Sequence, residues 1–564
     1  MHQFSTTLLV AALAAVPAFG QAPADPPAPV EAAIQGANEA AIRAHVKFLA
    51  SDLLEGRGPG TRGDAITTRY IASQFEALGL QPAGDDGSYF QTVSLLGLTY
   101  EPERSSVSFR RETGVPLNLK YLEEFVGLDQ TQRTRSTLDS ELMFVGHGVV
   151  APEYNWDDYK GMDVRGKTLV MLVDDPPASA AEPDLFKGKA RTYYGRWTYK
   201  FEIGAAKGAQ AVILIHTPKA AGYGWQVVRN SWGSEGAFTK LGEKDPALSF
   251  AGWITEDVAR NLFKTAGRDL DALTRAAASR DFRPVRLDGY RMIGDIATGI
   301  RTFDTANVVA RLEGSDPKLR GEAILYTAHH DHLGIGTPDA TGDRIYNGAI
   351  DNATGVAIVL ELARLWSETT PRPKRSVIFS MVAAEEQGLL GSAWYGRNPS
   401  IPAGRIALAL NFDAIYMIGR VRDVTMIGVE RTTFNPAAER VTKALGLAIV
   451  PDQDPEQGFY YRSDHFSLAR VGVPAFSVKP GHDVIGKPAG WGRARADEYR
   501  EKSYHQPSDE VAPDWDWSSG VQAVGLGFWL GWEAAQAAQM PNWLPGEEFR
   551  AIRDRSIAAG KSKG

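Results

Sequence analysis

From residue 307 onward the sequence alternates short apolar runs with longer amphipathic segments. The runs AILYTAHH (323–330) and SVIFSMVAAEE (376–386) flank ATGVAIVLELARLW (353–366), whose apolar residues recur three and four positions apart, as on one face of a helix. A sheet built from such uniformly apolar strands has to be covered by helices on both faces. The alternation therefore predicts an α/β fold, in which ligands bind beyond the carboxyl ends of the strands.

Acidic or histidine residues follow directly after these apolar runs. The segments are AHHDH (328–332), NGAIDNATG (347–355), AAEEQGLLGS (383–392) and LNFDA (410–414), and a later segment, SYHQPSDE (503–510), adds a further histidine. A solvated turn or a helix cap explains any one of them alone. Five such segments in order instead indicate a metal site, because imidazole and carboxylate are the usual nitrogen and oxygen ligands of zinc.

Taken together, these motifs resemble those of the M28 metallopeptidases. The resemblance covers the metal-bearing region and the N-terminal helices, and it implies a zinc exopeptidase fold: a three-layer sandwich around a mixed, mostly parallel sheet. It also implies two Zn²⁺ per chain, held by His329, Asp351, Glu386, Asp413 and His505. In this arrangement Asp351 bridges the two ions, Glu386 and Asp413 each complete the shell of one ion, and His505 binds the ion opposite His329.

Three further residues receive catalytic roles. The resemblance makes Glu385 the general base, which spacing alone cannot distinguish from its neighbour. Asp331, two residues after His329, fits the acceptor that takes the ligand's other ring N–H and fixes its tautomer. Tyr504 occupies the position where family members carry a tyrosine whose hydroxyl assists the oxyanion. A packed aromatic remains the alternative for Tyr504.

Other polar residues beside these motifs are expected to support the structure. The ligand count leaves His330 and His332 without a metal, so loop packing or pocket lining is expected for both. Residues 462–465 are expected to support the core, with pocket lining as the alternative. Asn352, which begins an Asn-Ala-Thr sequon, is interpreted as a cap beside Asp351 rather than as a glycan site.

Between about residues 122 and 297 the sequence changes to short β-like runs separated by turn residues. The segments 146–177 and 204–218 resemble a protease-associated (PA) domain, which several M28 members carry between the N-terminal helices and the metal-bearing sheet. By analogy such a domain is a lid that limits access to the site. The expected order is a signal peptide (1–20), the first part of the peptidase domain (21–121), the PA domain (122–297), the metal-binding peptidase domain (298–549) and a loose tail (550–564).

The first twenty residues resemble a secretory signal, with a short apolar stretch followed by small residues, although no Lys or Arg precedes the stretch. We therefore expect export to the periplasm or the medium. The sequence contains no cysteine, so neither disulfides nor a lipid anchor is expected. A net charge of −7 gives no reason to expect nucleic acid as a partner. No later segment is predicted to span a membrane, and residues 521–540 are expected to form a buried C-terminal helix.

These expectations describe an aminopeptidase that removes residues from peptides with a free N-terminus, using a metal-bridged water activated by Glu385. A carboxypeptidase or a dipeptidase on the same two-zinc site remains open. An N-terminal glutaminyl cyclase shares the fold but uses a single zinc. A non-catalytic, receptor-like binding protein would lack some of the ligands or the base, whereas all five ligands and Glu385 are present in this sequence.

Overall fold

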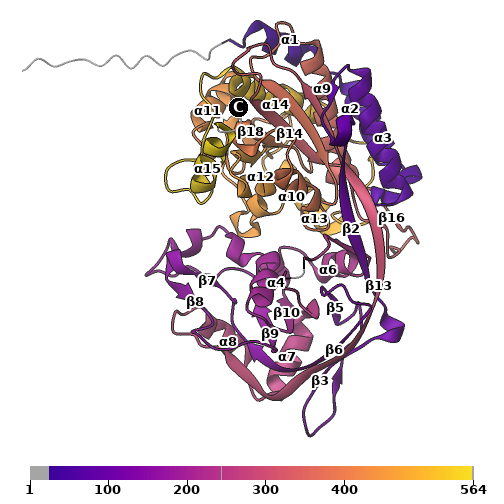
Figure 1. Ribbon diagram of the computed structural model, residues 1–564, viewed down its shortest axis with the longest axis vertical. Helices are drawn as coiled ribbons and strands as arrows, with labels where there is room; N and C mark the ends of the chain where they lie inside the picture. The colour runs from indigo at the N-terminus through magenta and orange to yellow at the C-terminus, as the bar shows by residue number, and fades with distance from the viewer. Residues whose placement is uncertain (1–24, 243, 562–564) are drawn as a thin grey trace, which may run out of the picture.

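A computed structural model describes residues 25–242 and 244–561, which form two bodies (Figure 1). The body that contains the expected peptidase segments is called the peptidase body, and the body formed around residues 122–297 is called the inserted module. The predicted signal peptide lies outside the described residues. One long strand, β13 (Val285–Leu312), runs through both bodies. Its first half pairs with β6 (Arg135–Phe144) of the module, and its last residues pair with β17 (Ser376–Val382) of the peptidase sheet. A continuous hydrogen-bonded sheet therefore connects the two bodies.

The peptidase sheet has the strand order β21–β18–β14–β17–β13. Strand β14 (Ala323–His329) is parallel to β17 and to β18 (Ile406–Asn411), and β18 is parallel to β21 (Ala475–Ser477), whereas β13 is antiparallel to β17. Every residue of β14, β17 and β18 is buried, which explains their uniformly apolar sequences. The predicted mixed, mostly parallel sheet is confirmed.

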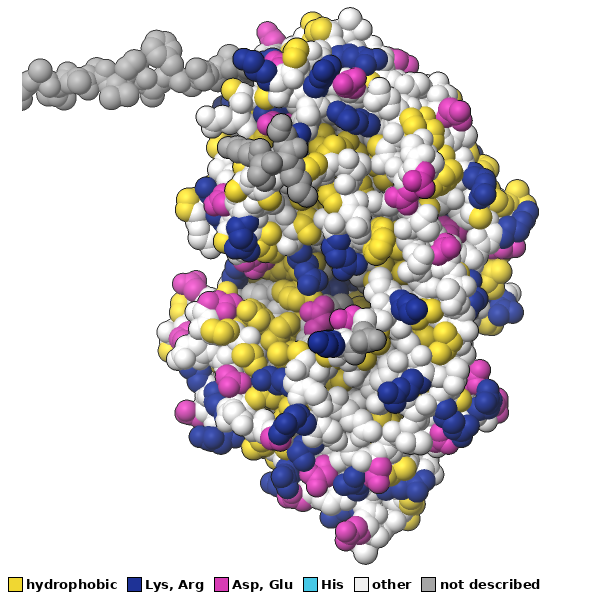
Figure 2. All heavy atoms as spheres, in the orientation of Figure 1, with side chains coloured by type: hydrophobic (Ala, Val, Ile, Leu, Met, Phe, Trp, Pro, Cys, Tyr) yellow, Lys and Arg dark blue, Asp and Glu magenta, His cyan; other side chains and the backbone are white. Residues whose placement is uncertain are grey.

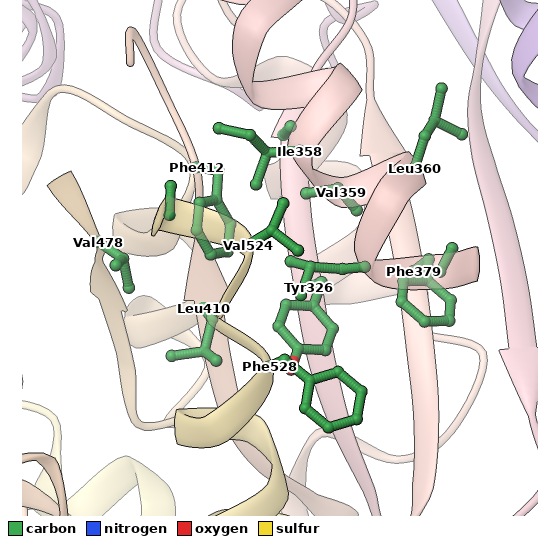
Figure 3. Close-up of a cluster of buried hydrophobic side chains, with 14 of the residues drawn as sticks. Tyr326, Ile358, Val359, Leu360, Phe379, Leu410, Phe412, Val478, Val524 and Phe528 are labelled. Carbon is green, nitrogen blue, oxygen red and sulfur yellow. The ribbon is translucent and has the colours of Figure 1, made fainter. Parts of the chain in front are cut away.

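Helices cover both faces of this sheet. The residues of β14 alternate between two cores: Tyr326 packs with α9 (Thr354–Glu368) and α14 (Ser518–Gln536), while Leu325 packs with α10 (Leu390–Arg397) and α12 (His465–Arg470). The N-terminal helices α1 (Ala28–Gly36), α2 (Glu39–Leu49) and α3 (Arg62–Ala77) join the first core. Figure 3 shows Tyr326 beside Phe379 and Phe528 in this core. The layers form the predicted three-layer sandwich.

The inserted module has its own sheet and its own cores. Four neighbouring strands are parallel to one another, in the order β6, β9 (Thr168–Leu172), β10 (Ala211–His216) and β12 (Phe250–Thr255). At the edge, β5 (Phe125–Leu128) pairs antiparallel with β12. Helices α4 (Trp197–Ala206), α6 (Trp225–Trp232), α7 (Glu256–Thr265) and α8 (Leu270–Ala277) accompany it. The module's core also includes Val107 and Phe109 of β3 (Ser106–Arg110), because β3 pairs with β13. The module therefore begins before residue 122, where its start was expected.

The C-terminus differs from the expected loose tail. Residues 550–561 form helix α15 (Arg550–Lys561), which packs against the peptidase body. The side chain of Arg553 is fully buried, and its Nη1 donates to the carbonyl of Ala403 at 3.0 Å. This contact and the close packing of Gly404 against Ser556 anchor a segment that had been expected to be loose. In the part of the chain that is described, no helix has the length and apolarity needed to cross a membrane.

Candidate metal centre

The loop that leads into α9 positions Asp351 at the centre of the site. The carboxylate of Asp509 accepts hydrogen bonds from the backbone amides of Ile350 at 2.9 Å and of Asp351 at 3.1 Å. The peptide bond between Asp351 and Asn352 is cis. The Oδ1 atom of Asn352 accepts from the amide of Gly355 at 3.0 Å, so the side chain caps α9 as expected. Backbone hydrogen bonds on both sides therefore fix the Asp351 carboxylate.

All five predicted ligands lie in one buried cluster, and Asp351 is shared by its two halves. In the first half, Nε2 of His329 is 3.1 Å from Oδ1 of Asp351 and 3.5 Å from Oδ1 of Asp413. In the second half, Nε2 of His505 is 2.9 Å from Oε2 of Glu386 and 3.5 Å from Oδ2 of Asp351. Within the described residues, two groups bring possible ligand atoms within 4.8 Å of one another: His329 with Glu385 and Asp413, and His329 with Asp351 and Glu386. Chain segments up to 176 residues apart thus converge at the carboxyl ends of the strands.

Asp331 has a different contact from the one expected. Its carboxylate accepts hydrogen bonds from the backbone amides of Glu385 at 3.1 Å and Glu386 at 3.4 Å. The Nδ1 atom of His329 lies 3.3 Å from the backbone carbonyl of Asp331 and 3.7 Å from its carboxylate. The acceptor nearest to the histidine is therefore the main chain of Asp331, while the side chain holds the turn that carries the two glutamates.

The two neighbouring histidines also have definite partners. The Nδ1 atom of His332 is 2.6 Å from Oε1 of Glu386, so His332 touches the carboxylate oxygen that faces away from His505. His330 places Nε2 3.0 Å from the carbonyl of Ala306 and supports β13. His330 therefore packs in the fold as expected. His332, for which loop packing or pocket lining was expected, instead orients a predicted ligand.

The cluster carries an excess of negative charge. Burial acts to lower the pKa of His505, but the carboxylates of Glu386 and Asp351 outweigh it and raise the pKa to about 10. Burial raises the pKa of Glu385 well above its usual range, and the carboxylate of Glu386 adds to this effect. Carboxylates crowded in a buried site favour binding of cations, whether protons or metal ions. The electrostatics therefore suit a site for divalent cations.

A buried arginine from the Gly-rich connection near residue 57 supports these loops. The guanidinium of Arg57 is 1% exposed and donates to the carbonyls of His330 at 2.9 Å, Asn347 at 2.6 Å and Gly348 at 3.0 Å. Burial lowers its pKa to about 10, although the surrounding carboxylates, Asp331 first, oppose the shift. Arg57 thus ties the segment that directly follows His329 at the end of β14 to the loop that contains Asp351.

Tyr504 lies against the ligands as its position in the sequence predicted. Its ring stacks on His505 with centroids 4.0 Å apart, and its hydroxyl accepts a hydrogen bond from Nη2 of Arg462 at 3.2 Å. Burial raises the pKa of Tyr504 well above its usual range, so the hydroxyl keeps its proton. Arg462, for which core support was the expected role, lines the site instead.

The inserted module contacts a predicted ligand directly. The Oγ atom of Ser231, on α6, is 3.1 Å from Nδ1 of His505. The side chain of Asn230 donates to the carbonyl of His505 at 3.3 Å and to Oε1 of Gln506 at 3.2 Å. Histidine ligands commonly have their second ring nitrogen fixed by such a partner. Helix α6 therefore orients the imidazole of His505.

Two cavities meet at this cluster. The smaller, of about 150 Å³, is lined mainly by the peptidase body, with Gly222 and Tyr223 of the module at its side, and reaches Asp351 and Asp413. The larger, of about 400 Å³, lies between the peptidase body and the module and reaches Glu386 and His505. Glu385 lines both. Figure 2 shows that the surface is hollowed between the two bodies, with hydrophobic, basic and acidic side chains around the hollow.

Sequence reasoning missed three residues that hold this site. Asp509 lies four residues after His505 in a motif that had been recognised, so its signal was present. Arg57 lies in the Gly-rich segment EGRGPGTRG, to which no site role had been assigned. Ser231 has no motif that points to the site, because it belongs to a different body of the fold.

Residues 307–526 match peptidase family M28. Leupeptin-inactivating enzyme 1 of Streptomyces exfoliatus is 25% identical over 289 residues, which cover 50% of this chain and 59% of that protein. A probable lipoprotein aminopeptidase, LpqL, of Mycobacterium tuberculosis is 27% identical over 278 residues, covering 47% of this chain and 52% of the relative. The chain thus spans little more than half the length of these curated relatives.

Among solved structures, an aminopeptidase from Aneurinibacillus sp. strain AM-1 is similar with a TM-score of 0.52 and 19% identity, covering 92% of this chain and 98% of that one. At this identity the similarity concerns the fold. The resemblance to the M28 family and the predicted fold class are both confirmed.

Proposed function

We propose that this chain, whose residues 307–526 match peptidase family M28, is a zinc-dependent aminopeptidase that binds two Zn²⁺. The observation that carries the proposal is the position of Asp351, whose two carboxylate oxygens each face a different histidine. His329, Asp351 and Asp413 would hold one ion, and His505, Asp351 and Glu386 would hold the other. A carboxylate that bridges two ions fixes their separation, as in two-metal hydrolases.

The donor atoms fit this metal. The Nε2 atoms of His329 and His505 are buried and have no hydrogen-bond partner among the described residues, although each lies close to two carboxylate oxygens. An unpartnered ring nitrogen among carboxylates costs stability unless a cation joins them. Neutral imidazole with carboxylate is a ligand set typical of zinc.

When bound, zinc would supply Lewis acidity that polarises the scissile carbonyl and lowers the pKa of the attacking water. Glu385, which has no ligand role in this proposal, takes the proton of that water and returns it to the leaving amine. The protonated hydroxyl of Tyr504 donates a hydrogen bond to the oxyanion that develops. Asp331 and His332 keep the two glutamates in place.

The free amine of the substrate needs an acidic partner, and Glu385 and Asp413 both line the smaller cavity. The name of the mycobacterial relative supports the aminopeptidase reaction over the other exopeptidase reactions. A complete set of five ligands and a base argues against a single-zinc cyclase and against a non-catalytic binding protein. We also propose that the inserted module is a PA-type lid and that the protein is exported.

The test is the Glu385→Gln protein. We expect it to retain about two zinc ions per chain and to lose about 10²- to 10⁴-fold in kcat on leucyl p-nitroanilide, because the proton acceptor is gone. Glu368→Gln, on the exposed end of α9, is the matched control and should match the wild type. Full activity of Glu385→Gln would refute the mechanism, and equal turnover of N-acetylated and free peptides would refute the aminopeptidase reaction.

A further inference from the structure

The larger cavity contains a buried arginine that lacks an ionic partner. Arg196 lies where α4 begins and is 7% exposed. Its Nε has no hydrogen-bond partner, and among the described residues no carboxylate forms an ion pair with its guanidinium. Burying a charge without a partner is costly, so natural structures rarely keep one without a reason. An anion that binds in the cavity would supply the missing partner.

A second arginine faces the same cavity. Arg462 comes from the peptidase body, and its Nη2 donates to the Tyr504 hydroxyl. It too has no carboxylate within ion-pair distance among the residues described, and it lies over the rings of Tyr223 and Phe459. The positive charge of Arg462 adds to burial in lowering the pKa of Arg196 to about 9, so the two cations are close enough to repel each other. A single anion between them would relieve this repulsion.

We propose that Arg196 and Arg462 bind the C-terminal carboxylate of a short peptide, so that the enzyme acts on dipeptides and tripeptides with a free C-terminus. This inference builds on the proposed aminopeptidase function. Glu385 lines both cavities. A peptide whose amine lies in the smaller cavity would therefore extend its other end past Glu385 into the larger one. That end carries a carboxylate, which guanidinium groups bind through paired hydrogen bonds.

The geometry also limits the length of the peptide. Arg462 touches Tyr504, the proposed oxyanion donor, so its guanidinium lies close to the scissile carbonyl. One residue spans about 3.3–3.6 Å of extended chain, so a carboxylate bound here belongs to the first or second residue after the cleaved bond. Trp197 and Trp232 of the module line the same cavity and contact each other edge to face. The module would thus select short substrates through the charge of Arg196.

The test compares leucylglycine with leucylglycinamide, which lacks the carboxylate. We expect the wild type to prefer the free acid by about tenfold or more in kcat/KM, mainly through KM, because hydrogen bonds between charged groups have about this worth. In Arg196→Met this preference should fall to about twofold or less. Arg275→Met, on the exposed surface of α8, removes a charge of the same kind and should retain the preference.

Several outcomes would overturn the inference. Equal rates for the two substrates with the wild type would do so, and so would an unchanged preference in Arg196→Met. A faster reaction with leucylglutamic diamide than with leucylglycine would also do so, because it would assign the cavity to an acidic side chain of the substrate. Leucyl p-nitroanilide, which has no carboxylate, reports the proposed function separately. If no substrate is cleaved, calorimetric titration of leucylglycine and its amide into the zinc-loaded protein still tests the carboxylate site. Arg196→Met should melt no lower than the wild type, since it removes an unpaired buried charge.

Discussion

Asp351 faces two histidines with separate atoms: its Oδ1 is 3.1 Å from Nε2 of His329, and its Oδ2 is 3.5 Å from Nε2 of His505. The two histidines are 176 residues apart in the sequence, and Asp351 lies within ion-pair distance of both. The carboxylate is held from behind by Asp509 through the amides of residues 350 and 351. The cluster therefore depends on one side chain for its division into two halves.

Substituting Asp351→Asn should remove metal from both halves. An amide has one carbonyl oxygen and no charge, so we expect fewer than one zinc ion per chain and a loss of activity of about 100-fold or more. Inductively coupled plasma mass spectrometry and the anilide assay measure the two effects. Asp288→Asn, at an exposed ion pair of the module, is the control. A variant that keeps two ions would show that Asp351 does not bridge them.

Substituting Ser231→Ala should weaken metal binding from a distance. It removes the partner of Nδ1 of His505, and loss of such a partner typically lowers metal affinity about 10- to 100-fold. Competition with a fluorescent zinc chelator measures the affinity. Ser234→Ala, just beyond α6, removes a hydroxyl that contacts only the backbone carbonyl of Asn230 and serves as the control. Equal affinities for the two variants would mean that α6 merely packs beside the site.

Tyr326→Phe should destabilise the peptidase core. The hydroxyl of Tyr326 donates to the carbonyl of Gly527 at 2.9 Å and accepts from Nε1 of Trp366 at 3.1 Å. Without it both groups remain buried and unpaired, which costs about 1–3 kcal/mol in the free energy of unfolding. The matched control is Tyr159→Phe, because the hydroxyl of Tyr159 is buried without a partner. Urea denaturation that shows equal losses for the two variants would contradict this assignment.

The module should lose stability in acid because of His147. This imidazole is buried, with Nδ1 2.9 Å from the carbonyl of Asp174, and burial together with the charge of Lys200 lowers its pKa to about 3. Between pH 6.5 and 3 the unfolded chain binds a proton that the folded chain does not, so stability falls as the pH falls through this range. By pH 5 the loss reaches about 2 kcal/mol.

His147→Asn tests this linkage, since its side-chain amide can replace the Nδ1 donor and does not titrate. Differential scanning calorimetry at pH 7.5 and pH 5 should show a smaller decrease in Tm for the variant than for the wild type. The same decrease in both proteins would assign the acid sensitivity to other groups.

The strands and helices of the peptidase body could be predicted because their pattern is local. The apolar run from Ala323 to Ala328 forms a strand buried on both faces, and residues 354–368 form a helix where the three- and four-residue spacing indicated one. The tail after Phe549 was not predictable in the same way. It forms helix α15, in which the buried Arg553 donates to the carbonyl of Ala403, a contact with a distant loop that no local pattern indicates.

The sequence by itself indicated that His329, Glu386 and Asp413 end or follow strands of the sheet, where ligands bind in such folds. Its resemblance to the M28 family supplied the full predicted ligand set, including Asp351 and His505. Tertiary structure alone decided which atoms meet. Ser231 reaches His505 across 274 residues, and Arg196 faces Arg462 across a boundary between two bodies. Such contacts depend on how separately folded surfaces pack, and packing leaves no periodic signal along a chain.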